Sequence, residues 1–223
     1  MNQFFAKLFN FLKREEVQAS MGLVSSTTSV IGNVTGDLSS TIVSEAVDAF
    51  KDASVLADTI MLNSILKGLA SGLNQEKYIN ELETYVNSNP ENAGRVASTL
   101  RKALLAESPM ACTLLGRMLA DHIREKTAYD RYDVIIVHAL EIATDTDLIA
   151  FRTMMNAYDG KTITITDLDT VDWCLTNRIF KQNVGMVESG AYIMAPRLEP
   201  TEAGKKLLGY IEETKSLFRD SLL

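Results

Sequence analysis

The sequence predicts a mainly α fold, in which a helical bundle is followed by a C-terminal module that contains a small β-hairpin. Two observations support this class. Apolar residues recur every three or four positions from Asp58 to about Thr144, the period of helices with one buried face. Further on, Asp167 to Phe180 indicates a helix, Val184 to Glu188 a strand, and Arg197 to Ile211 a strand that leads into a closing helix.

Composition and period divide the chain into three regions, residues 1–57, 58–144 and 145–223. The first region opens on an amphipathic segment and continues into a Ser/Thr/Gly-rich stretch. An amphipathic helix of this kind can lie on a membrane surface or on another protein. Residues 1–36 are therefore a candidate for peripheral membrane attachment. The candidate membrane or partner contacts are Phe4, Phe5, Leu8, Phe9 and Leu12.

Neither a signal peptide nor a simple transmembrane anchor is expected in this first region. Lys7 interrupts the short apolar run, and no small-residue cleavage site follows it. Val17 to Gly36 carries no charged residue over 20 positions, but only eight of these positions are apolar. A spanning helix needs a predominantly apolar stretch of about that length.

The second region is expected to fold as several packed helices. Gly72 follows one apolar series, Pro90 breaks the chain before the next, and Ser108 with Pro109 is the cap-then-proline order that begins a helix. The last helix of the region is apolar nearly all round, from Val134 to Ile142. This composition predicts a central, buried helix.

The third region begins with a helix expected from Asp147 to Tyr158. After the next helix, Ser189 and Gly190 suit the tip of a hairpin. Pro200, Thr201 and Glu202 then begin the closing helix, and an acidic first turn suits the helix dipole. Gly204 is expected to let that helix approach its neighbour closely.

The segment VGMVESGAYIMAPRLEPTEAGKKLL resembles the wing and closing helix of winged helix-turn-helix proteins. Their usual pattern is a Gly-apolar step, a short hairpin and then Leu-Thr-x-x-Gly. The resemblance covers the C-terminal third of the chain and implies a winged-helix-like module. In winged-helix proteins that bind DNA, the second helix lies in the major groove.

The charge of the corresponding helix argues against DNA recognition. It begins with Asp167, Asp169 and Asp172, and residues 147–223 contain nine Lys or Arg against eleven Asp or Glu, a net charge of −2 (9 − 11). The side chains suited to base edges lie towards its C-terminal end, and these candidate nucleic-acid contacts are Asn177, Arg178, Lys181 and Gln182. We therefore expect protein contacts or self-association from this module, with DNA binding as an alternative.

The overall composition is that of a globular protein with an acidic surface. The net charge is −7, which disfavours binding to phosphate backbones unless the charge is segregated. Cys112 and Cys174 lie far apart in apolar helical patterns, as expected of reduced structural thiols in a cytoplasmic protein.

No catalytic motif, metal site or cofactor site is expected. The sequence contains no Walker loop, dinucleotide fingerprint, G-x-S-x-G elbow or Cys/His framework, although an active site without a local motif stays open. The two histidines favour structural roles: His122 as a helix-end residue beside an exposed acidic face, and His138 as a partly buried polar residue.

The order of parts also resembles the bacterial abortive-infection alpha family. The comparable residues are Leu114 to Lys126 and Glu199 to Leu208, with Pro200 where that family has an apolar residue. The resemblance implies phage resistance through damage or arrest of the infected cell, but no catalytic residues. Three functions follow as hypotheses: a non-enzymatic bacterial or phage-encoded interaction protein, a membrane-acting defence protein, and a DNA-binding transcription regulator.

Overall fold

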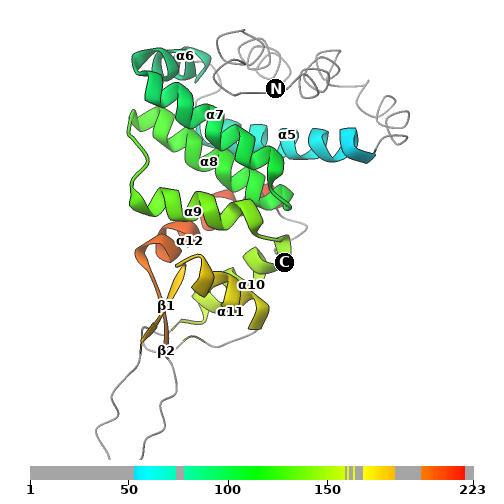
Figure 1. Ribbon diagram of the computed structural model, residues 1–223, viewed down its shortest axis with the longest axis vertical. Coiled ribbons are helices and arrows are strands. Elements are labelled where there is room, and N and C mark those ends of the chain that lie inside the picture. The colour runs from blue at the N-terminus through cyan, green and yellow to red at the C-terminus, as the bar shows by residue number, and fades with distance from the viewer. Residues whose placement is uncertain are drawn as a thin grey trace, which may run out of the picture. The chain divides into compact units, whose positions relative to one another are not determined.

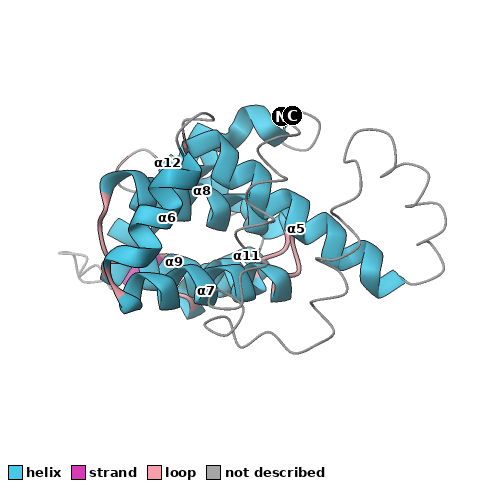
Figure 2. Ribbon diagram, turned by 90° about the horizontal axis from the view of Figure 1, so that it is seen from above, coloured by secondary structure: helices cyan, strands magenta, loops and turns pink. Residues whose placement is uncertain are grey.

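The computed structural model describes residues 53–73, 78–158, 160, 163, 168–183 and 197–218. Over these residues the fold is mainly α with a small antiparallel hairpin, as the sequence predicts (Figures 1 and 2). The chain forms two compact units, Met1–Ala128 and Tyr129–Leu223. The predicted boundary between residues 144 and 145 lies inside the second unit.

Four described helices build the first unit: α5 (Ala53–Gly72), α6 (Tyr78–Ser88), α7 (Pro90–Leu105) and α8 (Pro109–Glu125). The predicted start of α8 is confirmed, because the Ser108 hydroxyl accepts a hydrogen bond of 2.9 Å from the Ala111 amide, with Pro109 at the first helical position. In the same way, the Asn89 side chain accepts from the Glu91 amide, at 2.9 Å, and Pro90 begins α7.

Glycines bring α5 and α8 into close contact. A Cβ atom added at Gly68 would overlap the carbonyl oxygen of Thr113, and one added at Gly116 would overlap that of Ile65. The backbones of the two helices therefore touch where side chains would otherwise separate them. The core around this contact includes Ile65, Leu66, Leu69, Leu115 and Leu119.

The second unit contains α9 (Arg131–Ile142), α10 (Asp145–Asn156), α11 (Leu168–Thr176), β1 (Phe180–Asn183), β2 (Arg197–Pro200), α12 (Glu202–Thr214) and the 3₁₀ turn η1 (Lys215–Phe218). The strands β1 and β2 pair antiparallel, with Phe180 opposite Pro200 and Asn183 opposite Arg197. The closing helix begins as predicted, since the Thr201 hydroxyl accepts from the Gly204 amide at 3.2 Å.

Two expectations about these helices are wrong. The helix α9 is amphipathic rather than central, because Ile136, Ala139 and Leu140 are buried while Val134 and Ile142 are 51% and 53% exposed. The helix predicted to continue to Phe180 ends at Thr176. Its last turn is closed by Arg178, which takes a left-handed conformation (φ 58°) and leads the chain directly into β1.

Part of the predicted hairpin lies outside the described residues. This applies to the strand expected from Val184 to Glu188 and to the tip expected at Ser189 and Gly190. The N-terminal region, residues 1–52, also lies outside them, and with it the candidate contacts Phe4, Phe5, Leu8, Phe9 and Leu12.

Candidate functional site

The helix α11 is fixed firmly against its own unit by its inner face. The indole nitrogen of Trp173 donates to the carbonyl oxygen of Ala139 in α9, at 3.1 Å. The Trp173 ring also meets the Phe151 ring of α10 edge-on, with 6.2 Å between centroids. In addition, the Thr170 hydroxyl donates to the Asp147 carboxylate at 3.2 Å. The orientation of α11 is therefore set by three contacts, one with α9 and two with α10.

The outer face of α11 combines one large apolar side chain with two carboxylates. The outer face of α11 consists of the exposed residues Leu168, Asp169, Asp172 and Thr176. Leu168 is 71% exposed, the highest exposure among the large hydrophobic residues described. Its position in the first turn, beside Asp169, leaves an apolar group bordered by negative charge.

This composition decides what the face can bind. DNA phosphates are held by Lys, Arg and neutral donors, and base edges are read mainly by Arg, Asn and Gln. Asp169 and Asp172 would repel phosphates, and a leucine offers no hydrogen bond. A protein surface with an apolar group near a cation matches the outer face of α11 better.

The four predicted nucleic-acid contacts do not form one face of a helix. Asn177 and Arg178 lie in the turn after α11, and Lys181 and Gln182 lie on β1. The side-chain amide of Asn177 donates to the carbonyl oxygen of Trp173, at 2.9 Å, and so caps the end of α11. Lys181 pairs with Glu199 directly opposite on β2, with 3.0 Å between Nζ and Oε2.

The turn after α11 is joined to the start of α12. The Thr201 hydroxyl lies 2.8 Å from the Arg178 carbonyl oxygen and 2.9 Å from that of Ile179, and the Thr201 amide donates to the same Ile179 oxygen at 2.9 Å. A Cβ atom at Gly204 would lie 2.5 Å from the Ile179 oxygen, so only glycine fits without a shift. The predicted close approach at Gly204 is confirmed.

His122 lies in the last turn of α8, as predicted, but it is buried, and His138 is more exposed than predicted. His122 is buried, and its Nδ1 atom lies 2.8 Å from the Thr127 hydroxyl, so it helps to close the end of α8. The side chain of His138 is 66% exposed, and its Nδ1 atom lies 3.7 Å from Oε2 of Glu141 on the same helix. Across the described ranges, no group of three or more His, Cys, Asp or Glu side chains is placed to hold a metal ion.

Both cysteines are buried free thiols, as predicted. The Cys112 thiol donates to the carbonyl oxygen of Ala103 at 2.9 Å. Burial raises the pKa of the Cys174 thiol far above its ordinary value, and the nearby Asp147 carboxylate adds to the rise. A thiol held protonated in this way is a poor nucleophile.

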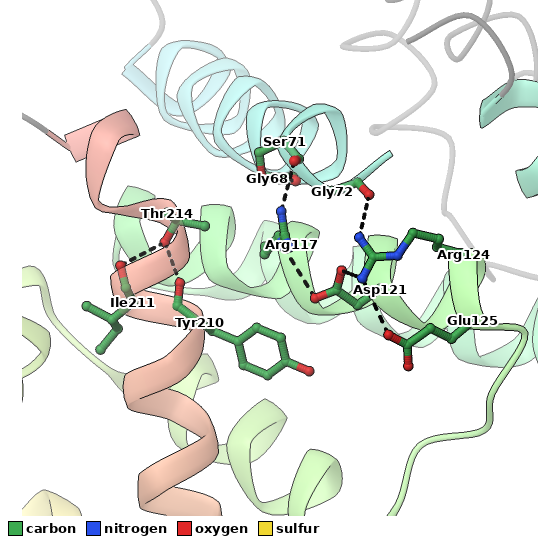
Figure 3. A network of polar contacts seen from close by, with 10 residues as sticks. All are labelled: Gly68, Ser71, Gly72, Arg117, Asp121, Arg124, Glu125, Tyr210, Ile211 and Thr214. Atoms are coloured by element: carbon green, nitrogen blue, oxygen red, sulfur yellow. Dashed lines mark hydrogen bonds and ion pairs between the residues drawn. The ribbon is translucent and has the colours of Figure 1, made fainter. Parts of the chain in front are cut away.

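A polar cluster that joins α5 and α8 in the first unit is structural. Arg117 donates to the carbonyl oxygen of Ser71 at 2.8 Å, and Arg124 donates to that of Gly72 at 3.2 Å (Figure 3). Asp121 lies between the two guanidinium groups, at 3.3 Å from Arg117 and 2.7 Å from Arg124. The cluster satisfies carbonyl groups at the C-terminal end of α5 and fixes that end to α8.

Comparisons with protein-family models, with curated proteins and with solved structures found no match to this chain. The resemblances to winged-helix proteins and to the abortive-infection alpha family therefore stay predictions. Among the helices that the structure describes, none combines the length and apolar character needed to cross a membrane.

Proposed function

We propose that this protein is a non-enzymatic interaction protein whose winged-helix-like C-terminal module binds another protein surface through the outer face of α11. The observation that carries the proposal is the composition of this face. Leu168 is 71% exposed and is followed by the exposed carboxylates of Asp169 and Asp172. In the resemblance to winged-helix proteins, α11 corresponds to the helix that DNA-binding members place in the major groove.

Two further observations support a protein partner. The inner face of α11 is held by Trp173, Phe151 and Thr170, so the outer face is presented by a rigid helix. A rigid helix loses little conformational freedom on binding, which lowers the entropic cost of forming the complex. Moreover, Lys181 is engaged by Glu199 across the hairpin, so this cation is already partly neutralised.

Site-specific photo-cross-linking tests the proposal. A photoreactive amino acid would replace Asp172 in the full chain, and a matched variant would carry it at Glu213, an exposed position on α12. We expect a protein adduct from position 172, either with a second copy or with another protein, and none of that mass from position 213. Equal adducts from both positions, or none from position 172 at any protein concentration, would overturn the proposal.

A further inference from the structure

We propose that the outer face of α11 binds the C-terminal turns of α7 in a second copy of this chain. In this arrangement Leu168 and Asp172 of one copy lie against Leu105 and Arg101 of the other. The inference rests on the proposed function, and it names both the partner and the surface that the partner offers.

The C-terminal turns of α7 expose an apolar and a basic side chain side by side. Leu105, the last residue of the helix, is 63% exposed, and Arg101, one turn earlier, is exposed as well. The core of the first unit is built by other residues of α7, including Val96 and Leu100. Leu105 therefore contributes little to the packing of its own unit and is available for another surface.

The two surfaces match in spacing as well as in composition. Residues four apart on a helix lie on one face, about 6 Å from each other. Leu168 and Asp172 have this spacing on α11, and Arg101 and Leu105 have it on α7. When α11 of one copy runs antiparallel to α7 of the other, Leu168 lies opposite Leu105, and Asp172 lies opposite Arg101. A parallel arrangement would instead place each leucine against a charge.

Electrostatics favours the same pairing. Asp169 adds a second carboxylate on one side, and Lys102 adds a second cation on the other. The chain has a net charge of −7, so two copies repel each other on average and are expected to associate only where opposite charges meet locally. Antiparallel helices also align their macrodipoles favourably.

The proposed contact joins two different surfaces, so each copy can donate α11 to one neighbour and accept α11 from another. A contact centred on so few side chains belongs to the small interface class, which is typically weak. We expect self-association to become visible only at roughly 10 to 100 μM protein.

Charge reversal of the full chain tests the inference by sedimentation velocity over a concentration series. The variants are Asp172→Arg and Arg101→Glu, with Glu213→Arg and Lys67→Glu as controls that change an exposed charge of the same sign in the same unit. We expect each reversal at the proposed contact to weaken self-association by about tenfold and each control to change it less than about threefold.

Mixing the two reversed variants gives the decisive result. The arginine introduced at position 172 of one variant would then face the glutamate introduced at position 101 of the other, while the unchanged surfaces of the pair still complement each other. The mixture should regain association close to that of the original chain, which also shows that both variants are folded.

Each failure has a distinct meaning. A chain that stays monomeric at the highest concentration, or a mixture that does not associate, overturns the inference. If Asp172→Arg weakens association but Arg101→Glu acts like Lys67→Glu, the α11 face binds a different surface, so the inference falls and the proposed function stands. If neither reversal acts and position 172 forms no cross-link, both fall.

Discussion

Lys206 Nζ lies 2.6 Å from Oδ1 of Asp133, whose side chain is completely buried. Asp133 also accepts the Asp130 amide at 2.8 Å and so forms half of the capping box that begins α9. Burial lowers the pKa of Lys206, but hydrogen bonds to Asp133 and Asp130 outweigh this effect and leave the pKa above its ordinary value. One cation thus ties α12 to the start of α9.

Replacing Lys206 should destabilise the second unit far more than replacing its neighbour. Lys206→Met would leave the buried Asp133 carboxylate without its cation, and we expect a loss of about 2 kcal/mol, less than for a fully buried pair because Lys206 is partly exposed. Lys205→Met removes only an exposed pair with Glu202 and should leave the urea midpoint nearly unchanged. Equal effects of the two substitutions in urea unfolding would refute this role of Lys206.

The contact between α5 and α8 predicts opposite effects of one substitution at two helical glycines. Gly116→Ala would force the two backbones apart and should destabilise the first unit by about 2 kcal/mol. Gly94→Ala on α7 meets nothing within 4 Å and should stabilise by about 0.5 to 1 kcal/mol, because alanine is the better helix former. Thermal unfolding followed by circular dichroism measures both shifts, and a stabilising Gly116→Ala would contradict the close packing.

A similar pair tests the junction between α12 and the turn after α11. Gly204→Ala brings a methyl group against the Ile179 carbonyl oxygen and should cost about 1 to 2 kcal/mol, whereas Gly209→Ala projects into open space and should stabilise. Guanidinium unfolding of the two variants distinguishes them. If Gly204→Ala were neutral, the interlock at Thr201 would not hold α12 as described.

Acid should weaken the second unit partly through Glu212. Hydrogen bonds from Arg152, at 2.7 Å, and from Lys215, at 3.0 Å, lower the pKa of this carboxyl below its ordinary value. A lowered folded-state pKa stabilises the fold above the unfolded-state pKa of about 4.3, and this stability is lost as the pH falls through the folded-state value.

Glu212→Gln should therefore lower the free energy of unfolding by about 0.5 kcal/mol at pH 7, after allowance for solvent screening. The difference from the original chain should narrow as the pH falls through the lowered folded-state pKa and should disappear once the Glu212 carboxyl is protonated. Glu213→Gln serves as the control. A difference that stayed constant from pH 7 to pH 3 would show that the ion pairs of Glu212 do not contribute.

Local sequence signals predicted the helix starts well. Ser108 with Pro109 and Thr201 with Glu202 cap their helices as expected, because capping depends on only a few consecutive residues. The fold class followed from the same local patterns. The role of Gly204 was also predictable, because a glycine inside an expected helix permits close approach, but the sequence did not reveal that the neighbour is the Ile179 carbonyl oxygen, which is distant along the chain.

Tertiary packing explains what the sequence did not reveal. The composition of α9 is apolar nearly all round, yet only one face is covered, so Val134 and Ile142 remain exposed. The burial of His122 and the exposure of His138 were not predicted, because a residue's burial depends on elements distant in the chain. No local pattern links Lys206 to Asp133, and the left-handed turn at Arg178, which shortens α11, lacks the usual glycine.

We expect α11 to present a surface for protein rather than for DNA. Fluorescence anisotropy of a mixed-sequence DNA duplex with the full chain at about 50 mM salt tests it most directly, because phosphate contacts are strongest at low ionic strength. We predict no saturable binding, and no change on replacing Arg178 and Lys181 with alanine. Saturable binding that weakens steeply with salt and is lost in the Arg178→Ala, Lys181→Ala variant would show instead that this module binds DNA.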